Sequence, residues 1–270
     1  MAVHICRTCG TSYPDARSPP ARCVICEEER QYVARSGQAW VTPEALAASH
    51  ANGWRQMEPG LFEIETQPKF AIGQRAFLLR TPNGNILWDC IALIDDATVA
   101  IVRAMRGLRA IAISHPHYYT TMQDWAREFG APVFLHARDR EWVMREDSHL
   151  HFWDEESREL LPGVVLHRLG GHFPAGAVLH WAEGAEGRGA LLAGDIVQVS
   201  PRMGHVSFLW SYPNRMPLSG RSVQRIAAAV DGLPFERIYG AFGLHVLEGG
   251  RDAVRRSAAR YVELLDSEQP

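Results

Sequence analysis

Residues 109–120, R-A-I-A-I-S-H-P-H-Y-Y-T, end a short apolar run with two histidines, His115 and His117. Alternate residues of a strand share one side, so two histidines one residue apart at a strand end can face one point. Three later segments also carry a polar side chain after an apolar run: G-G-H-F-P-A-G (170–176) with His172, L-L-A-G-D-I-V (191–197) with Asp195, and I-Y-G-A-F-G-L-H (238–245) with His245. Imidazole and carboxylate groups are ligands that zinc prefers, so the sequence predicts a metal site.

The order of these residues resembles the metallo-β-lactamase superfamily. Its pattern is a strand, His-x-His-x-Asp-His, a later Gly-His, a Gly-Asp after an apolar strand, and a final His near the C-terminus. The segment P-N-G-N-I-L-W-D-C (82–90) is also similar to the family's second hairpin. The resemblance implies an α/β (α+β) fold, the αββα metallo-β-lactamase sandwich, preceded here by a small zinc-binding knuckle.

One part of the motif departs from the family, and this changes the expected metal count. The resemblance implies a first metal position with the ligands His115, His117 and His172, and Asp195 bridging towards a second position. Tyr119 and Thr120 stand where the family has Asp-His. Because a neutral phenol or hydroxyl binds divalent cations weakly, we expect one tightly held ion in the main site. His245 is then a weak further ligand or an outer group.

The chemistry that suits this site best is metal-assisted hydrolysis. A zinc ion held by histidines and a carboxylate lowers the pKa of bound water towards 7 and polarises a carbonyl. We predict that Asp195 orients the water and that Tyr119 donates to the developing oxyanion. Tyr118 and Arg215 are predicted to contact the substrate, Arg215 through an anionic group. The resemblance implies small esters, thioesters or lactones as substrates.

Two other functions remain open at this stage. Two histidines and one carboxylate also suit ferrous iron and dioxygen, and persulfide dioxygenases share this fold. The third function is that of a metal-stabilised binding protein without turnover, because Tyr119 and Thr120 replace two ligands. In that case the cysteine knuckle would dock a partner.

Four of the five cysteines form two pairs near the N-terminus, Cys6-x-x-Cys9 and Cys23-x-x-Cys26. Each short turn can present two thiolates to one ion, and two such turns complete a tetrahedron. The segment between the pairs has too few apolar residues to fold alone, so metal binding would supply the folding energy. We predict a zinc-ribbon-like site that folds independently of the main site. Rubredoxin-like iron and free or redox-active thiols are alternatives, and Cys90 is predicted to pack in the core.

The chain is predicted to have three parts: a zinc-ribbon-like module of four cysteines (1–30), a helical connector (31–59) and a metallo-β-lactamase-fold domain (60–270). In the connector we expect a helix up to Gly37 and a second one that opens at Thr42-Pro43. In the domain, Asn83-Gly84 predicts a hairpin turn and Asp96 a helix cap.

Further elements are expected in the domain from periodicity and capping signals. Thr121-x-x-Asp124 predicts a capping box for the helix that follows the histidine pair. Strands are predicted at 61–65, 76–79, 132–135, 164–169, 177–181, 190–193 and 206–210. Two late helices are predicted around residues 223–230 and 254–265.

Composition narrows the class of protein. A chain of 270 residues that is 46% hydrophobic can bury a full core. Its net charge of −3 gives no basic stripe for nucleic acid, and no apolar run approaches the roughly 20 residues of a membrane span. The N-terminus lacks the apolar core of a secretion signal. We therefore expect a cytoplasmic enzyme with a small-molecule substrate and no nucleic-acid or membrane partner. Homo-oligomerisation stays open.

Overall fold

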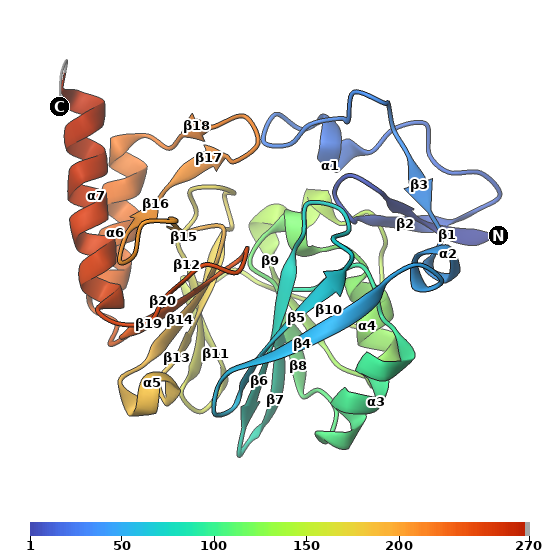
Figure 1. Cartoon of the computed structure of the whole chain (residues 1–270), viewed down its shortest axis with the longest axis horizontal. Helices are drawn as coiled ribbons and strands as arrows, with labels where there is room; N and C mark the ends of the chain where they lie inside the picture. Colours follow the sequence, from blue (N-terminus) through green and yellow to red (C-terminus); the bar gives the residue numbers. More distant parts are fainter. Residues whose placement is uncertain (268–270) are drawn as a thin grey trace. The chain divides into compact units, whose positions relative to one another are not determined.

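The computed structural model describes residues 1–267, which divide into two compact units (Figure 1). The first unit is Met1–Trp153 and the second begins at Asp154. Within these residues, no helix combines the length and hydrophobicity that crossing a bilayer requires. The predicted division at residues 30 and 59 stays a prediction.

The N-terminal part of the first unit is a small three-stranded sheet with the order β2-β1-β3. Its elements are β1 (Ala2–Cys6), β2 (Ser12–Ala16), the short helix α1 (Val24–Glu27), β3 (Trp40–Val41) and α2 (Pro43–Ala47). As predicted, α2 opens at Thr42, whose hydroxyl accepts from the backbone N–H of Ala45 at 3.3 Å. The helix predicted up to Gly37 is wrong. The chain becomes extended at Glu28, and this charged run has no apolar stripe to bury.

A seven-stranded sheet with the order β10-β9-β8-β7-β6-β5-β4 forms the rest of the first unit. Its strands are β4 (Ala51–Glu58), β5 (Leu61–Gln67), β6 (Arg75–Thr81), β7 (Gly84–Trp88), β8 (Ala110–Ala112), β9 (Val133–His136) and β10 (Leu150–Trp153). The first four strands pair antiparallel. Residues 51–58 were expected in a helical connector, but as β4 they extend this sheet because they pair along β5.

The strands β7 to β10 run parallel, and this places polar groups at one edge of the sheet. Asp89 follows β7, the segment 113–117 follows β8, and His136 and Trp153 end β9 and β10. The carboxyl ends of parallel strands meet at the same edge, which is where open α/β sheets carry their sites. The strand predicted to end before His115 is therefore β8, and its carboxyl end lies at this edge of the sheet.

Two local predictions in this unit shift by one residue. Thr81 pairs with Gly84, so the hairpin turn consists of Pro82 and Asn83 and not of Asn83-Gly84. Helix α3 (Asp96–Ala104) is capped by Asp95, which accepts from the Thr98 N–H at 2.8 Å, so the cap lies before Asp96.

Helix α4 (Met122–Phe129) directly follows the histidine segment and ends at the left-handed Gly130. The predicted capping box is wrong. The Thr121 hydroxyl instead donates to the carbonyls of Ile91 and Ala92, at 3.2 and 3.0 Å. Thr121 therefore joins α4 to the chain that leaves β7, a tertiary contact that overrides the local signal.

The second unit is a six-stranded sheet with the order β11-β12-β13-β14-β19-β20. Its strands are β11 (Ser157–Leu161), β12 (Val164–Arg168), β13 (Ala177–Trp181), β14 (Ala190–Gly194), β19 (Arg237–Gly240) and β20 (His245–Val246), and α5 (Gly184–Gly187) lies between β13 and β14. Two small ribbons add β15 (Gln198–Val199) with β16 (Val206–Ser207), and β17 (Leu209–Ser211) with β18 (Met216–Pro217). The predicted strand 206–210 is thus divided at Phe208.

Helices α6 (Gly220–Asp231) and α7 (Gly250–Asp266) pack on this sheet. Val223, Ile226 and Val230 of α6 share a core with Leu191 and Ile238 of the sheet. The two late helices are therefore confirmed. Val254 and Ala258 of α7 are buried as their spacing predicted, whereas Leu265 at the end of the predicted stripe is 45% exposed.

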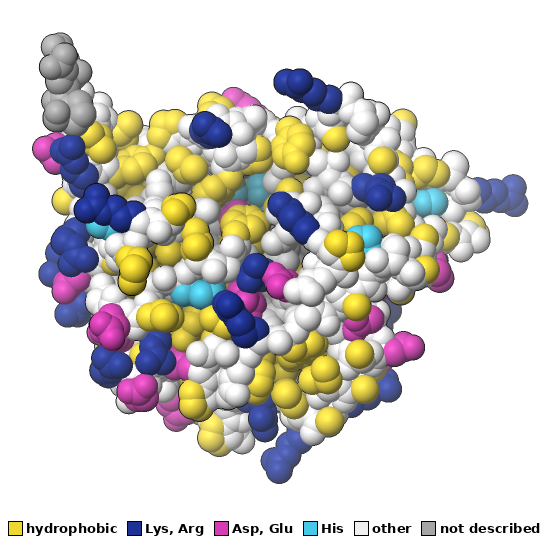
Figure 2. All heavy atoms as spheres, in the orientation of Figure 1, with side chains coloured by type: hydrophobic (Ala, Val, Ile, Leu, Met, Phe, Trp, Pro, Cys, Tyr) yellow, Lys and Arg dark blue, Asp and Glu magenta, His cyan; other side chains and the backbone are white. Residues whose placement is uncertain are grey.

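On the face that Figure 2 shows, basic and acidic side chains lie intermixed with apolar ones.

Candidate functional site

The four N-terminal cysteines converge on one point. The Sγ atoms of Cys6 and Cys26 are 3.6 Å apart, as are those of Cys9 and Cys23, and all four thiols are buried and free. Four sulfurs about 2.3 Å from a zinc ion would form a tetrahedron with edges of about 3.8 Å. The donor set and its spacing therefore fit a tetrahedral thiolate site.

Polar groups around this cluster are arranged as outer partners of the sulfurs. The Tyr13 hydroxyl donates to Cys23 Sγ at 3.3 Å, and Gln38 Nε2 donates to Cys6 Sγ at 3.1 Å. Hydrogen bonds from Cys23 and Cys26 lower the pKa of the Cys6 thiol, which favours its thiolate form. Burial raises the pKa of Cys9, a cost that a bound cation would reverse.

A second group of possible ligands contains the residues His115, His117, His172 and Asp195. Each offers one ligand atom, and these atoms all lie within 4.8 Å of one another. All four residues are buried. Three imidazoles and a carboxylate fit a borderline divalent cation, with zinc and ferrous iron among the candidates.

In the first unit, the histidine pair is held by the backbone around it. His115 ends the extended segment after β8, and His117 lies in the 3₁₀ turn η1 (Pro116–Tyr118). The Asp89 carboxylate accepts from the Ser114 N–H at 2.7 Å, and the Ser114 hydroxyl lies 2.9 Å from His115 Nδ1. These bonds fix the start of the turn, which is the role of outer partners in metal sites.

In the second unit, His172 lies in a glycine turn between β12 and β13. Gly171 has φ +90°, and a Cβ there would lie 2.8 Å from Ile226 Cδ1, so only glycine fits. His172 Nδ1 is 2.8 Å from the Trp210 carbonyl oxygen. A carbonyl can only accept, so Nδ1 carries the proton and Nε2 has the lone pair that a metal binds.

Asp195 follows β14, whose last residue is Gly194. The Tyr212 hydroxyl donates to the Asp195 carbonyl at 2.7 Å. The Tyr212 ring packs edge-on against the His172 ring, with 5.3 Å between the ring centroids. Burial raises the pKa of the Asp195 carboxyl from its ordinary value of 3.8 to about 7. A cation at this group would favour the ionised form and reverse that shift.

This raised pKa predicts how the metal-free protein responds to pH. The folded state holds the Asp195 proton more tightly than the unfolded state, so stability is lost as pH rises from about 4 to about 7. A shift of this size is on the order of 4 kcal/mol. In thermal unfolding of chelator-treated protein, Asp195→Asn should become steadily more stable than the unaltered protein over this range. A difference that stays constant with pH would contradict the prediction.

The residues predicted to contact the substrate or the oxyanion differ in their burial. Tyr118 is fully buried and packs edge-on against the His115 ring at 5.2 Å. The Tyr119 hydroxyl donates to the Asp139 carbonyl at 3.4 Å, and burial raises its pKa, so the phenol stays protonated. Arg215 is exposed in the turn between β17 and β18. The roles predicted for these three residues stay predictions.

His245 is not among the four residues of the second group. It lies on β20, where its Nδ1 accepts from the Gly240 N–H at 3.3 Å and its ring faces Tyr239 at 5.3 Å. Its role as a further ligand also stays a prediction. Cys90 is completely buried, as predicted for a packing residue.

Three supporting residues were not assigned a role from the sequence: Asp89, Tyr212 and Gln74. Asp89 lies near the end of the hairpin motif at 82–90, and Tyr212 lies three residues before Arg215, which was expected to contact the substrate, so position alone could have indicated them. Gln74 has no such signal. Its Nε2 donates to the carbonyls of both Cys9 and His117.

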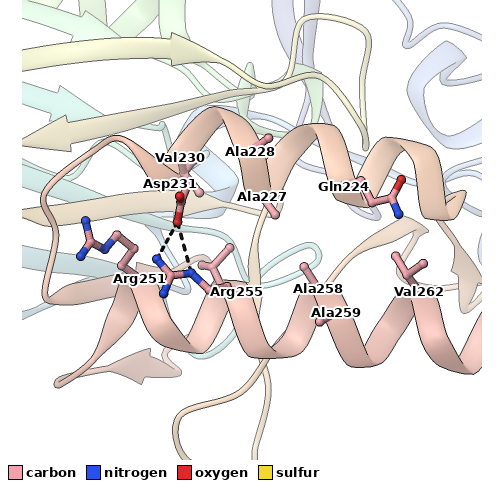
Figure 3. A pocket seen from close by; sticks show the side chains of 11 residues that line it. Gln224, Ala227, Ala228, Val230, Asp231, Arg251, Arg255, Ala258, Ala259 and Val262 are labelled. Carbon is pink, nitrogen blue, oxygen red and sulfur yellow. Dashed lines mark hydrogen bonds and ion pairs between the residues drawn. The ribbon is translucent and has the colours of Figure 1, made fainter.

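A groove between α6 and α7 offers no ligand group of this kind (Figure 3). It has a volume of about 590 Å³, and its lining includes Ala227, Ala228, Ala258 and Ala259. The acidic residue in it, Asp231, is paired with Arg255 at 2.8 Å. Among residues 1–267, the groups that could hold a metal ion are the cysteine group and the histidine–aspartate group.

Comparisons with known proteins identify a relative of this chain and, separately, its fold. No protein-family model matches the chain. The uncharacterized protein YmaE of Bacillus subtilis (strain 168) is 46% identical over 270 residues, which cover 99% of this chain and 98% of that protein.

Solved metallo-β-lactamases share the architecture at low identity. TMB-1 is 11% identical with a TM-score of 0.60, covering 80% of this chain and 99% of its own. FIM-1 from Pseudomonas aeruginosa in the mono-zinc form is 14% identical with a TM-score of 0.57, covering 78% and 96%. The enzyme from Erythrobacter litoralis is 17% identical with a TM-score of 0.53, covering 78% and 92%. The predicted metallo-β-lactamase fold is therefore confirmed.

Proposed function

We propose that this chain, which belongs to the family of the Bacillus subtilis protein YmaE and has the metallo-β-lactamase fold, is a metal-dependent hydrolase. Its substrates are small esters, thioesters or lactones. The observation that carries the proposal is the buried group of His115, His117, His172 and Asp195, whose ligand atoms lie within 4.8 Å of one another. Three neutral imidazoles and one carboxylate are the donor set of a zinc-dependent hydrolase.

We further propose that the group of His115, His117, His172 and Asp195, called the histidine centre from here on, works with one ion. Tyr119 and Thr120 occupy the two positions where the family has its Asp-His ligands. Both side chains are neutral, and Tyr119 is directed to a backbone carbonyl. FIM-1, one of the structures with this fold, has been crystallised in a mono-zinc form, which supports the feasibility of such a centre on this fold.

The bound cation would supply an activated water at neutral pH and polarise the substrate carbonyl. Asp195 is buried and held through its backbone by Tyr212, so its carboxylate can orient the attacking water and accept its proton. The phenol of Tyr119 is protonated, and it would donate to the oxygen on which negative charge develops by exchanging its hydrogen bond to the Asp139 carbonyl for one to the substrate. The Asp89–Ser114 hydrogen bond keeps the histidine pair in place through the reaction.

The cysteine group is proposed to hold a zinc ion of its own. All four thiols point at one another in a closed, buried site, which leaves no open position for a substrate. Closed sites of four thiolates are structural, so this ion would supply folding energy and take no part in hydrolysis.

Elemental analysis together with an esterase assay tests the proposal. Protein purified without added metal should contain zinc at a ratio of one ion for each of the two groups. It should hydrolyse at least one member of a panel of activated esters, thioesters and lactones, and a chelator should remove that activity.

Two results would overturn it. Iron in the histidine centre, with oxygen consumption in the presence of a persulfide, would identify an oxidoreductase. A metal-filled histidine centre that hydrolyses no ester, thioester or lactone and oxidises no persulfide would identify a binding protein.

A further inference from the structure

The cysteine knuckle lies directly against the loop that follows His117. Gly10, in the tight turn after Cys9, has φ +82° and donates to the Cys6 carbonyl at 2.9 Å. A Cβ at Gly10 would lie 3.4 Å from Thr120 Cγ2 and 3.5 Å from Gln74 Nε2. The turn that presents two of the four thiols is thus in contact with the histidine loop.

Gln74 joins these two segments through a single amide group. Its Nε2 donates to the Cys9 carbonyl at 2.6 Å and to the His117 carbonyl at 3.0 Å. Gln74 is only 5% exposed. An amide nitrogen has two hydrogens, so each carbonyl receives one, and a carboxylate of the same shape could not replace it.

Ser12, the first residue of β2, makes the second connection. Both its N–H and its hydroxyl donate to the Thr120 carbonyl, at 2.9 and 2.7 Å. The Ser12 hydroxyl in turn accepts from Arg145 Nη1 at 3.0 Å. Arg145 is buried and forms a two-point ion pair with Asp124 of α4, at 2.6 and 2.9 Å. This charge-assisted network fixes the Ser12 side chain.

Thr120 itself shows that the loop needs such support. Its φ is +26°, a backbone conformation that a β-branched residue rarely adopts. Residues in sparsely populated conformations persist only where their surroundings hold them. The two hydrogen bonds from Ser12 provide that hold three residues after His117.

We propose that the cysteine knuckle is a positioning element of the histidine centre. When an ion closes the knuckle, Gln74 and Ser12 hold residues 117–120 in the conformation that ligates the second ion. Emptying the knuckle releases Cys9 and Ser12, and with them the loop, so the two metal sites are energetically coupled. These contacts argue against the independence that the sequence alone suggested. The inference rests on the proposed metal centre and not on the reaction it performs.

The test measures the zinc affinity of the histidine centre in the full-length protein by competition with a chelator. Gln74→Glu removes the two donated hydrogen bonds at constant shape, and Ser12→Ala removes one of the two bonds to Thr120. Each should weaken zinc binding at the histidine centre by about tenfold or more, as the loss of an outer partner does. The cysteine site should stay filled. Gln56→Ala is the matched control, because Gln56 is exposed and its amide donates to the Glu58 carbonyl of its own strand, at 3.5 Å.

A double-mutant cycle separates coupling from general destabilisation. Cys9→Ser should also weaken zinc binding at the histidine centre, and by less in the Gln74→Glu background than in the unaltered chain. Unchanged affinity in both Gln74→Glu and Ser12→Ala, with the cysteine site filled, would overturn the inference. Because affinity is measured and not turnover, an absence of hydrolysis would refute the proposed reaction and leave this result intact.

Discussion

Asp195→Ala is expected to abolish hydrolysis and to release the metal from the histidine centre. The variant removes the one anionic ligand of the group and leaves three neutral imidazoles. Loss of an outer partner costs about 10- to 100-fold in metal affinity or activity, so loss of this ligand should cost about 10³-fold or more in kcat/KM. Elemental analysis and the esterase assay on the same sample report both effects.

Asp231→Ala is the matched control for that experiment. Asp231 is an exposed aspartate of α6 whose partner is Arg255, and solvent screens this pair. The control should keep the metal and the full rate. An Asp195→Ala variant that kept its rate would show that the chemistry lies elsewhere in the chain.

Cys9→Ser is expected to unfold the N-terminal segment, the second large effect. The core of this segment consists of the four cysteines with Tyr13 and Ile25, so it has few apolar side chains apart from the thiols. Structural zinc contributes about 10 kcal/mol or more to the folding of such modules. Trypsin should therefore cleave the variant after Arg7, which lies in the tight turn between Cys6 and Cys9, far faster than it cleaves the unaltered protein.

Cys90→Ala separates this effect from the general loss of a thiol. Cys90 is buried outside both ligand groups, so its replacement should leave the metal content and the resistance of Arg7 to trypsin unchanged. Equal resistance in Cys9→Ser and Cys90→Ala would mean that the segment folds without an ion.

The two groups of candidate ligands could be predicted from the sequence because their residues follow recognisable patterns. His115 and Asp195 come after short apolar strands, and paired cysteines at a spacing of three residues form knuckles. These signals are local and chemically specific. Helices α6 and α7 were predictable for the same reason, because their apolar residues recur at helical spacing.

The connections between the two metal sites could not be predicted, because they depend on residues far apart in the chain. Ser12 and Arg145 are 133 residues apart, and Gln74 is a single amide with no repeating pattern around it. At Thr121 the sequence does carry a signal, but the prediction from it is wrong. The spacing of Thr121 to Asp124 is a valid capping signal, but the Thr121 hydroxyl is used in a tertiary contact. Residues 51–58 were likewise misassigned because their strand character comes from pairing with β5.

The hold of Ser12 on the Thr120 carbonyl has a consequence for protein engineering. Converting Tyr119 and Thr120 to the Asp-His of the wider superfamily would place the new histidine at a residue whose positive φ is held by the hydrogen bonds from Ser12. A designer who wants a dinuclear enzyme from this scaffold must therefore rebuild the contact with β2 as well as the loop. A second ion in the main site and the hydrogen bonds from Ser12 would both depend on the backbone conformation at Thr120.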